Sequence, residues 1–158
     1  METVSRIKNL ETNVKHNSTD NINPSFEVVV IEDNHLTNTI LSKALDSTIK
    51  TIHNLKQISV KFSSFQNGSD FLSYLESREF GESKLIVFSD YHLEENMNGA
   101  EILKNIKQTN VDSTVIIMSD SPNNQIPIDT MNLGAYCFLP KDNKTTVICS
   151  QLLFQMVS

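Results

Sequence analysis

The feature that most constrains the fold is a regular alternation between short, largely apolar runs and longer segments with helical spacing. Four apolar runs occupy residues 26–31, 84–90, 115–118 and 136–139, and residues 58–63 alternate between apolar and polar side chains. Short apolar runs of this kind are typical of strands that are covered on both faces. Five strand–helix alternations predict an α/β fold, a doubly wound parallel sheet with helices on both faces.

Each predicted strand is followed by apolar residues at the spacing of an amphipathic helix. The helical positions are Leu36, Ile40, Leu41, Ala44, Leu45, Ile49 and Ile52; then Phe71, Leu72 and Leu75; then Ile102, Leu103 and Ile106; then Ile128, Met131 and Leu133; and last Val147, Ile148, Leu152 and Leu153. Asn34, Asn98 and Asn143 stand at expected helix starts and are predicted to be caps. Right-handed crossovers and the flavodoxin-like strand order 2-1-3-4-5 are the expected solution for five strands.

Composition limits the class of protein. The 158 residues suit one domain, and 13 basic against 19 acidic side chains leave a net charge of −6, which argues against nucleic-acid binding. No apolar stretch is long enough to cross a membrane, and two cysteines, Cys137 and Cys149, suit a reducing compartment. The sequence therefore predicts a cytoplasmic protein with neither nucleic acid nor membrane as a partner.

The excess acid belongs to one part of the chain. Residues 1–25 are polar, rich in Asn and balanced in charge, so we expect a flexible N-terminal tail there, with a docking arm as the alternative. All six excess negative charges fall in residues 26–158, which we expect to form the folded domain. The residues after Lys141 suffice for one helix and leave no room for an effector domain.

Chemically active side chains stand where the predicted strands end. The first strand ends in Glu32 and Asp33, the third in Asp90, the fourth in Ser119, and the fifth just before Lys141. Ligands of doubly wound sheets bind at the carboxyl ends of the strands, and the first and third strands are neighbours there. Three carboxylates at one edge would repel one another unless a cation balanced them, and Mg²⁺ suits such an oxygen cluster.

The remaining two groups suit an anion. The Ser119 hydroxyl and the Lys141 ammonium match the oxygens of a phosphoryl group, so the whole set predicts phosphoryl transfer to a carboxylate. Each residue alone has an ordinary explanation, since an Asp at a strand end is often a cap or turn residue and a Lys is often solvated. The joint occurrence at the ends of the right strands carries the prediction.

Five segments carry a resemblance to a known family. The segments VVVIEDN, LIVFSDYHL, MNGAEIL, VIIMSDS and GAYCFLPKD resemble the response-regulator receiver domain of two-component phosphorelays, over residues 26–158. The resemblance implies that Asp90 accepts the phosphoryl group. It also implies an Mg²⁺ site formed by Asp90, Asp33, Glu32 (through water) and the backbone carbonyl of His92.

The resemblance implies a switch as well. Ser119 would bind a phosphoryl oxygen, Lys141 would pair with Asp90 or its phosphate, and Phe138 holds the aromatic switch position. The domain would catalyse its own phosphorylation and dephosphorylation, while acting mainly as a signalling switch. A sensor histidine kinase or a phosphotransfer protein would be the donor, and a downstream protein would bind the face formed by the fourth helix, fifth strand and fifth helix.

The sequence departs from the family pattern at several points. The stretch between Asp33 and Asp90 is long, and we place the extra residues in 48–57, with a further possibility at 79–83. Asp120 stands beside Ser119, where a small residue usually leaves room for the phosphoryl group. Asp120 favours one alternative, a pseudo-receiver that is an interaction module without phosphorylation. A small hydrolase or phosphotransferase on the same sheet is the other alternative, although a second nucleophile and a base are not recognisable.

Overall fold

The structure, a computed structural model, describes residues 25–79, 83–94 and 96–157. The strands are β1 (Phe26–Ile31), β2 (Val60–Phe65), β3 (Lys84–Asp90), β4 (Ser113–Ser119) and β5 (Cys137–Pro140). The helices are α1 (His35–Lys56), α2 (Gly68–Ser77), α3 (Gly99–Gln108), α4 (Gln125–Asn132) and α5 (Thr145–Met156). Apart from Ser25, the predicted tail lies outside the described residues, as does most of 79–83.

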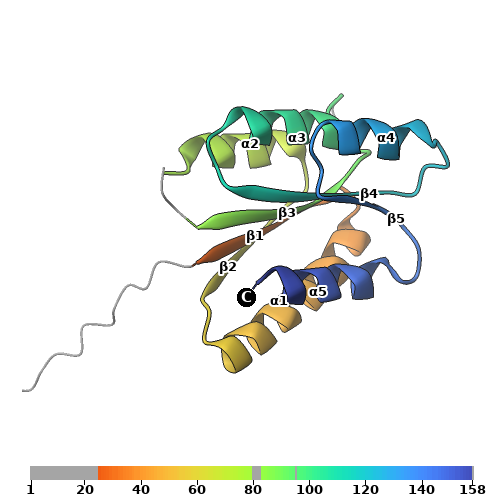
Figure 1. The fold of residues 1–158 in the computed structure, drawn as a ribbon. Helices are drawn as coiled ribbons and strands as arrows, with labels where there is room; N and C mark the ends of the chain where they lie inside the picture. The colour runs from red at the N-terminus through yellow and green to blue at the C-terminus, as the bar shows by residue number, and fades with distance from the viewer. Residues whose placement is uncertain (1–24, 80–82, 95, 158) are drawn as a thin grey trace, which may run out of the picture.

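The sheet has the predicted architecture. Its five strands lie in the order β2-β1-β3-β4-β5, and every neighbouring pair is parallel. Helices α1 and α5 cover one face, and α2, α3 and α4 cover the other (Figure 1). The flavodoxin-like fold class is therefore confirmed.

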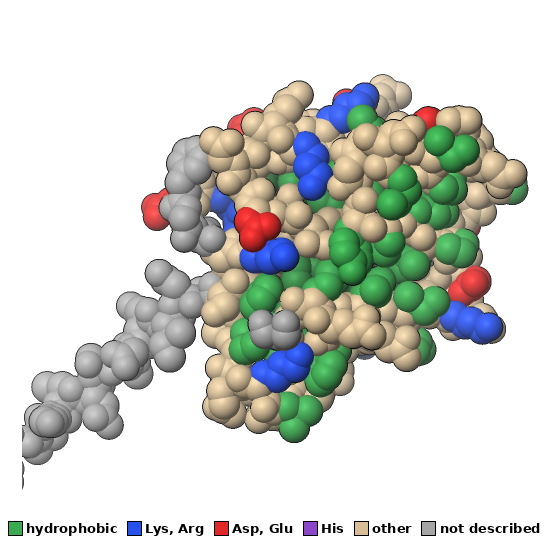
Figure 2. Space-filling view, in the orientation of Figure 1, with side chains coloured by type: hydrophobic (Ala, Val, Ile, Leu, Met, Phe, Trp, Pro, Cys, Tyr) green, Lys and Arg blue, Asp and Glu red, His purple; other side chains and the backbone are tan. Residues whose placement is uncertain are grey.

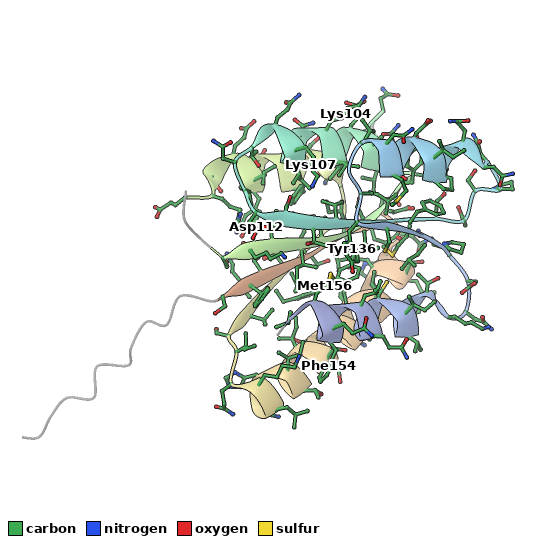
Figure 3. All side chains as sticks on the ribbon, viewed as in Figure 1. Lys104, Lys107, Asp112, Tyr136, Phe154 and Met156 are labelled. Carbon is green, nitrogen blue, oxygen red and sulfur yellow. The ribbon has the colours of Figure 1, made fainter. Side chains whose placement is uncertain are left out.

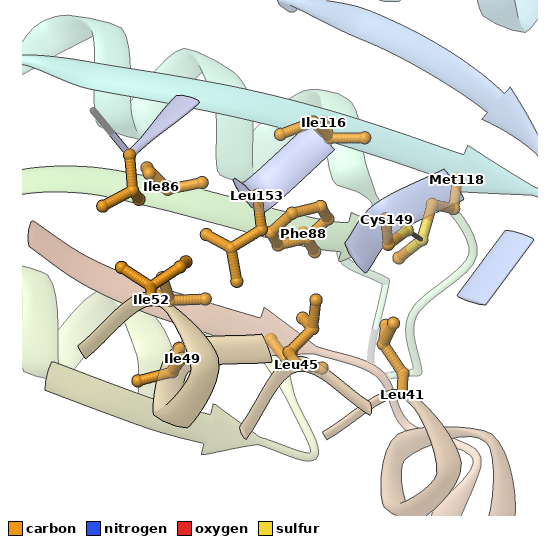
Figure 4. Close-up of a cluster of buried hydrophobic side chains, with 13 residues drawn as sticks. Leu41, Leu45, Ile49, Ile52, Ile86, Phe88, Ile116, Met118, Cys149 and Leu153 are labelled. Carbon is orange, nitrogen blue, oxygen red and sulfur yellow. Dashed lines mark hydrogen bonds between the residues drawn. The ribbon is translucent and has the colours of Figure 1, made fainter. Parts of the chain in front are cut away.

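Strand alternation divides the interior into two cores. Successive side chains of a strand point to opposite faces, so Phe88 packs under α1 and α5 while Val87 packs under α2 and α3. Figure 4 shows the first core, where Phe88 lies among aliphatic side chains from both helices and from β4. Cys149 lies in this core beside Met118, and burial raises the pKa of its thiol to about 12. Both cysteines are free, and Cys149 is protonated and inert at neutral pH.

Two of the three predicted asparagine caps are confirmed. The side chain of Asn34 accepts a hydrogen bond from the Thr37 amide at the start of α1, and Asn98 does the same for Glu101 at the start of α3. Asn143 was wrongly predicted as a cap. The turn before α5 is instead closed by Asp142, whose carboxylate accepts from the Lys144 amide.

The first helix is long, as the extra residues at 48–57 predict. It runs for 22 residues and ends at Gln57, which adopts a left-handed conformation. Lys56, in its last turn, donates to the backbone carbonyls of Phe154 and Val157 and lies over the Phe154 ring. The added turns of α1 therefore reach and hold the end of α5.

Several apolar residues at helical spacing lie outside the core. In α1, Leu36 is 68% exposed and Ile40 is exposed as well. In α4, Ile128 and Met131 are exposed, whereas Thr130 is buried, with its hydroxyl satisfied by donating to the Ile126 carbonyl. A further exposed residue of this kind is Val147 in α5. Helical spacing therefore identified the apolar stripe of each of these helices, but it also assigned to the core residues at the margin of the stripe that are exposed.

A buried carboxylate near the start of β1 is satisfied by side chains from several elements. Glu27 of β1 is buried and bonds to the Tyr74 hydroxyl and, at 3.0 Å, to Arg78 Nε. Lys61 Nζ lies 3.5 Å from the same carboxylate. Two cations and a hydroxyl thus satisfy one buried acid, which would otherwise be costly.

Within the described residues, no helix combines the length and apolar character that crossing a bilayer requires.

The central position of Phe88 makes a stability prediction. Phe88→Ala removes a fully buried ring and should lower the free energy of unfolding by about 3–5 kcal/mol. Leu36→Ala, at an exposed site, should change it by less than about 0.5 kcal/mol. Urea unfolding of both variants checks this, and equal losses would contradict the assignment of Leu36 to the surface.

Candidate functional site

Strand alternation also places the charged groups of the site. Val30, Phe88 and Leu139 all point toward α1 and α5. Each of these residues is followed, two positions later, by a charged residue on the same side of the sheet. These charged residues are Glu32, Asp90 and Lys141. The carboxyl ends of β1, β3 and β5 thereby bring two acids and a base to one face.

The predicted acidic cluster is present. Carboxylate oxygens of Glu32, Asp33 and Asp90 all lie within 4.8 Å of one another. Glu32 and Asp90 are buried, and Asp33 is half-buried. The cluster opens into a hollow of about 510 Å³, whose lining includes these residues together with Asn34, Thr37, Leu41, His92, Met118, Asp120, Lys141, Asp142, Thr145 and Thr146.

Lys141 is the cation that faces the acids. Its ammonium lies 3.1 Å from Asp90 Oδ1, which is the ion pair that the resemblance implied. It lies closer still, at 2.6 Å, to Glu32 Oε2. The other Glu32 oxygen, Oε1, accepts from the Asn34 amide at 3.0 Å.

Burial dominates the titration of this group of charges. It raises the pKa of both Glu32 and Asp90, and the hydrogen bonds and charge of Lys141 offset only part of that effect. For Lys141, burial alone would lower the pKa, but the hydrogen bond to Glu32 and the charges of both acids outweigh it, so its pKa is raised. A single ammonium is therefore shared between two carboxylates that are held out of water.

The loop after Asp90 is pinned close to the site. The Tyr91 amide donates to the Met118 carbonyl at 2.7 Å, and the Gly99 amide donates to the Tyr91 carbonyl at 2.7 Å. A Cβ on Gly99 would lie 3.0 Å from the Asp90 carbonyl oxygen, a tight contact that the backbone would have to relieve, so glycine suits this close approach. The His92 amide faces Asp90 Oδ1 at 3.4 Å, and the His92 side chain is exposed.

Ser119 and Phe138 lie on the other face of the sheet. Ile117 pairs with Phe138 between β4 and β5, and both pack with the core under α2 and α3. Ser119 follows Ile117 by two residues and is buried, with its Oγ accepting from the Ser121 amide at 3.1 Å. Of the described residues, those lining the hollow include Met118 and Asp120 but not Ser119.

The donor set suits a hard divalent cation. Three carboxylates converge, and one ammonium does not neutralise them. Oxygen ligands of this kind are those that Mg²⁺ binds, usually with several waters retained. Such a cluster is typical of the magnesium site of a receiver domain.

A family comparison agrees with the geometry. The family model for the response regulator receiver domain matches residues 28–153, which is most of the chain. The chain belongs to the response regulator receiver domain family. Receiver domains are modules of two-component systems, and the recognition made from the five segments is confirmed.

Solved receiver domains share the fold at low sequence identity. The receiver domain of the Francisella response regulator 1452 is 16% identical, with a TM-score of 0.61, over 86% of this chain and 100% of that chain. The signal receiver domain of a DNA-binding response regulator from Colwellia psychrerythraea 34H is 20% identical, with a TM-score of 0.66, over 84% and 98%. The phosphorylated cyanobacterial phytochrome response regulator RcpA is 18% identical, with a TM-score of 0.60, over 82% and 89%. No curated protein matches the sequence.

This receiver departs from the usual pattern at Asp120. The residue is exposed, and it lines the hollow that contains the acidic cluster. Asp120 therefore adds a negative charge to the entrance that a phosphoryl group would use.

Sequence reasoning missed the pair between Lys141 and Glu32. The signal for it was the glutamate itself, because its extra methylene extends the carboxylate further than an aspartate would. Asn38, whose side chain holds the Glu32 carbonyl at 2.9 Å, was also missed, since it stood in an apolar helical pattern without a visible partner.

The raised pKa of Asp90 makes a prediction for the metal-free receiver. The folded state binds the Asp90 proton more tightly than the unfolded state, so stability falls as pH rises above the ordinary Asp pKa of 3.8 through the raised value. Asp90→Asn removes this loss and should raise the stability at pH 7 by about 1 kcal/mol, or about 2–4 °C in Tm.

Thermal unfolding from pH 4 to pH 8 without divalent cations checks this. Asp112→Asn, at the opposite end of the sheet (Figure 3), is the matched control and should leave the Tm unchanged. A Tm for Asp90→Asn at or below that of the control at pH 7 would contradict the buried-charge account.

Proposed function

We propose that this receiver accepts a phosphoryl group on Asp90 from a sensor histidine kinase or a phosphotransfer protein. One observation carries the proposal. The Asp90 carboxylate stands at a strand end with two further acids within 4.8 Å and with the Lys141 ammonium 3.1 Å away. A nucleophile, a cation site and a positive charge thus surround one position at the mouth of the hollow.

The proposed step is an in-line displacement. An Asp90 oxygen attacks the phosphorus of the donor phosphohistidine, a bond from oxygen to phosphorus forms, and the phosphorus–nitrogen bond breaks with its electron pair returning to the imidazole. The attacking carboxylate must be ionised. Lys141 favours the ionised form of Asp90, whereas burial disfavours it and raises the pKa of Asp90.

Asp33, Asp90 and the backbone carbonyl of His92 would hold Mg²⁺, with Glu32 acting through water. A bound Mg²⁺ neutralises charge on the transferred phosphoryl oxygens. Lys141 takes the remaining charge of the phosphoryl group, and in doing so it leaves Glu32.

Signalling would follow from a switch across the sheet. We propose that the Ser119 hydroxyl, whose oxygen accepts from the Ser121 amide, donates its proton to a phosphoryl oxygen. Phe138 lies on the same face as Ser119 and would turn inward as that residue moves. Phosphorylation would in this way shift the population of two states of α4 and β5.

The surface beside Phe138 supports an output by protein binding. Hydrophobic side chains gather between α4 and α5 over the edge of the sheet (Figure 2). Tyr136, just before β5, lies between these helices (Figure 3) and is 55% exposed. Ile128 and Met131 of α4 are also exposed, and this α4–β5–α5 face is the proposed site for the downstream protein.

The free thiols and the acidic composition fit a cytoplasmic location.

The pseudo-receiver alternative rests on Asp120. Its carboxylate at the entrance repels an incoming phosphoryl group and would slow the reaction without removing any reactive residue. The complete acidic cluster favours the phosphorylated form of the proposal.

The first test is formation of the acyl phosphate. Incubation with acetyl phosphate and Mg²⁺ should add about 80 Da to the intact mass, in a form stable to acid and labile to base. Asp90→Asn should abolish the adduct, and Asp142→Asn, at an exposed position lining the same hollow, should keep it. An adduct that survives in Asp90→Asn would overturn the assignment, and no adduct on the wild-type chain would favour the pseudo-receiver.

A second test separates the chemistry from the switch. Lys141→Ala should still bind Mg²⁺, because Asp33 and Asp90 remain, but phosphorylation should no longer change the amide exchange of β5 around Phe138. Hydrogen exchange with mass spectrometry, with and without acetyl phosphate, measures this. Lys144→Ala, which alters an exposed lysine three positions later, should respond like the wild type. A full response in Lys141→Ala would show that the lysine does not couple the two events.

A further inference from the structure

Asn38 is a polar residue in an otherwise apolar stripe. The buried residues of α1 are Asn38, Leu41, Leu45, Ile49 and Ile52. Asn38 is only 7% exposed, and it lies on the second turn of the helix, directly after the loop that carries the acids. A buried amide needs partners on both its oxygen and its nitrogen, since an unpaired polar group in the interior is costly.

The hydrogen bonds of Asn38 fix the direction of its amide. Its Nδ2 donates to the carbonyl oxygens of Glu32, at 2.9 Å, and Phe65, at 3.2 Å. Its Oδ1 accepts from the hydroxyls of Ser64, at 2.7 Å, and Ser42, at 3.0 Å. The reverse orientation would set Oδ1 against two carbonyl oxygens, so only this one satisfies the group.

These bonds extend the sheet by one step beyond the last strand pair. The pairing of β1 with β2 ends at Ile31 and Phe65, and the Glu32 amide still donates to the Phe65 carbonyl at 3.1 Å. The Glu32 carbonyl has left the strand by then, and the Asn38 side chain supplies its donor. Asn38 therefore anchors the backbone at the point where β1 becomes the acidic loop.

The Glu32 carboxylate is held at both of its oxygens, one of them by the anchored loop. The Asn34 backbone amide donates to Oε1. The Asn38 backbone amide in turn donates to the Asn34 carbonyl at 2.8 Å. Lys141 holds Oε2 at 2.6 Å. A loop that is held at its carbonyl, at its first carboxylate and at its helix start has little freedom left.

We propose that Asn38 is a positioning residue for the cation site: through the Glu32 carbonyl it holds Glu32 and Asp33 where they can bind Mg²⁺ together with Asp90. The proposal rests on the proposed function and names a residue that acts on it. Asn38 does not line the hollow, so its effect passes through the backbone of Glu32. Groups that orient metal ligands in this way commonly change metal affinity by about 10–100-fold when removed.

Titration calorimetry of the full chain with MgCl₂ tests the effect on affinity. Asn38→Ala should weaken Mg²⁺ binding by about 10–100-fold. Asn38→Leu is a second variant that continues the apolar stripe and is expected to fold, while it removes both donors; it should show the same loss. Retained affinity in Asn38→Leu would overturn the proposal.

Three control variants separate positioning from general stability. Ser42→Ala and Ser64→Ala each remove a hydrogen bond to Oδ1 but leave both bonds from Nδ2, so the Mg²⁺ affinity should stay close to that of the wild type. Ile52→Val loosens the same helix at its far end and should also leave the affinity unchanged. If these controls lose affinity in proportion to their Tm, as the Asn38 variants do, Asn38 has a structural role only.

A measurement without metal distinguishes the failure of this proposal from failure of the proposed function. In the metal-free protein, amide exchange of Glu32 and Asn34 should be faster in Asn38→Leu than in the wild type, while exchange in β4 stays unchanged. Wild-type protein that binds no Mg²⁺ would refute the cation site, and the exchange result would still decide whether Asn38 holds the loop. Unchanged exchange at Glu32 would overturn the positioning role.

Discussion

The constraint from which the rest follows is an excess of negative charge at the carboxyl end of the sheet, among the residues that the structure describes. Glu32 and Asp90 are buried side by side, Asp33 completes the cluster, and Lys141 is the one cation paired with them among the residues that the structure describes. At the other end, Glu27 has both Arg78 and Lys61 within ion-pair distance. Among the described residues, one buried acid thus has two cations at one end of the sheet, whereas three acids share one ammonium at the other.

The architecture and the acidic cluster follow from the sequence because both depend on backbone geometry. Parallel strands joined by helices bring their carboxyl ends to one edge, so Asp33 and Asp90 meet even though a long stretch of chain separates them. The period of two along each strand determines which side chains share a face, although the register that sets Phe138 beside Ile117, on the face of Ser119, comes from the structure. These relations need no knowledge of how any side chain is turned.

The remaining features depend on side-chain geometry in three dimensions. Lys141 lies closer to Glu32 than to Asp90 because of the length of one side chain, and a pattern of residue types does not contain that distance. Leu36 is exposed although it fits the helical spacing, because that spacing does not show which turns of a helix a neighbouring element covers. Asn38 finds its partners just after β1, at Glu32, and on β2, at Phe65, so its role became visible only when the two strands were paired.

The sheet divides the interior into two cores that pack against its opposite faces. Side chains under α1 and α5 surround the acids, while those under α2, α3 and α4 surround Phe138, and the strands stand between them. The Lys141 backbone amide donates to the Ser119 carbonyl at 2.8 Å, which joins the residue that pairs with the acids to the strand end that carries Ser119. Substitutions under α1 and α5 and substitutions under α2, α3 and α4 therefore act on the same strands, so the sheet itself is where a change near the acids and a change near Phe138 would meet.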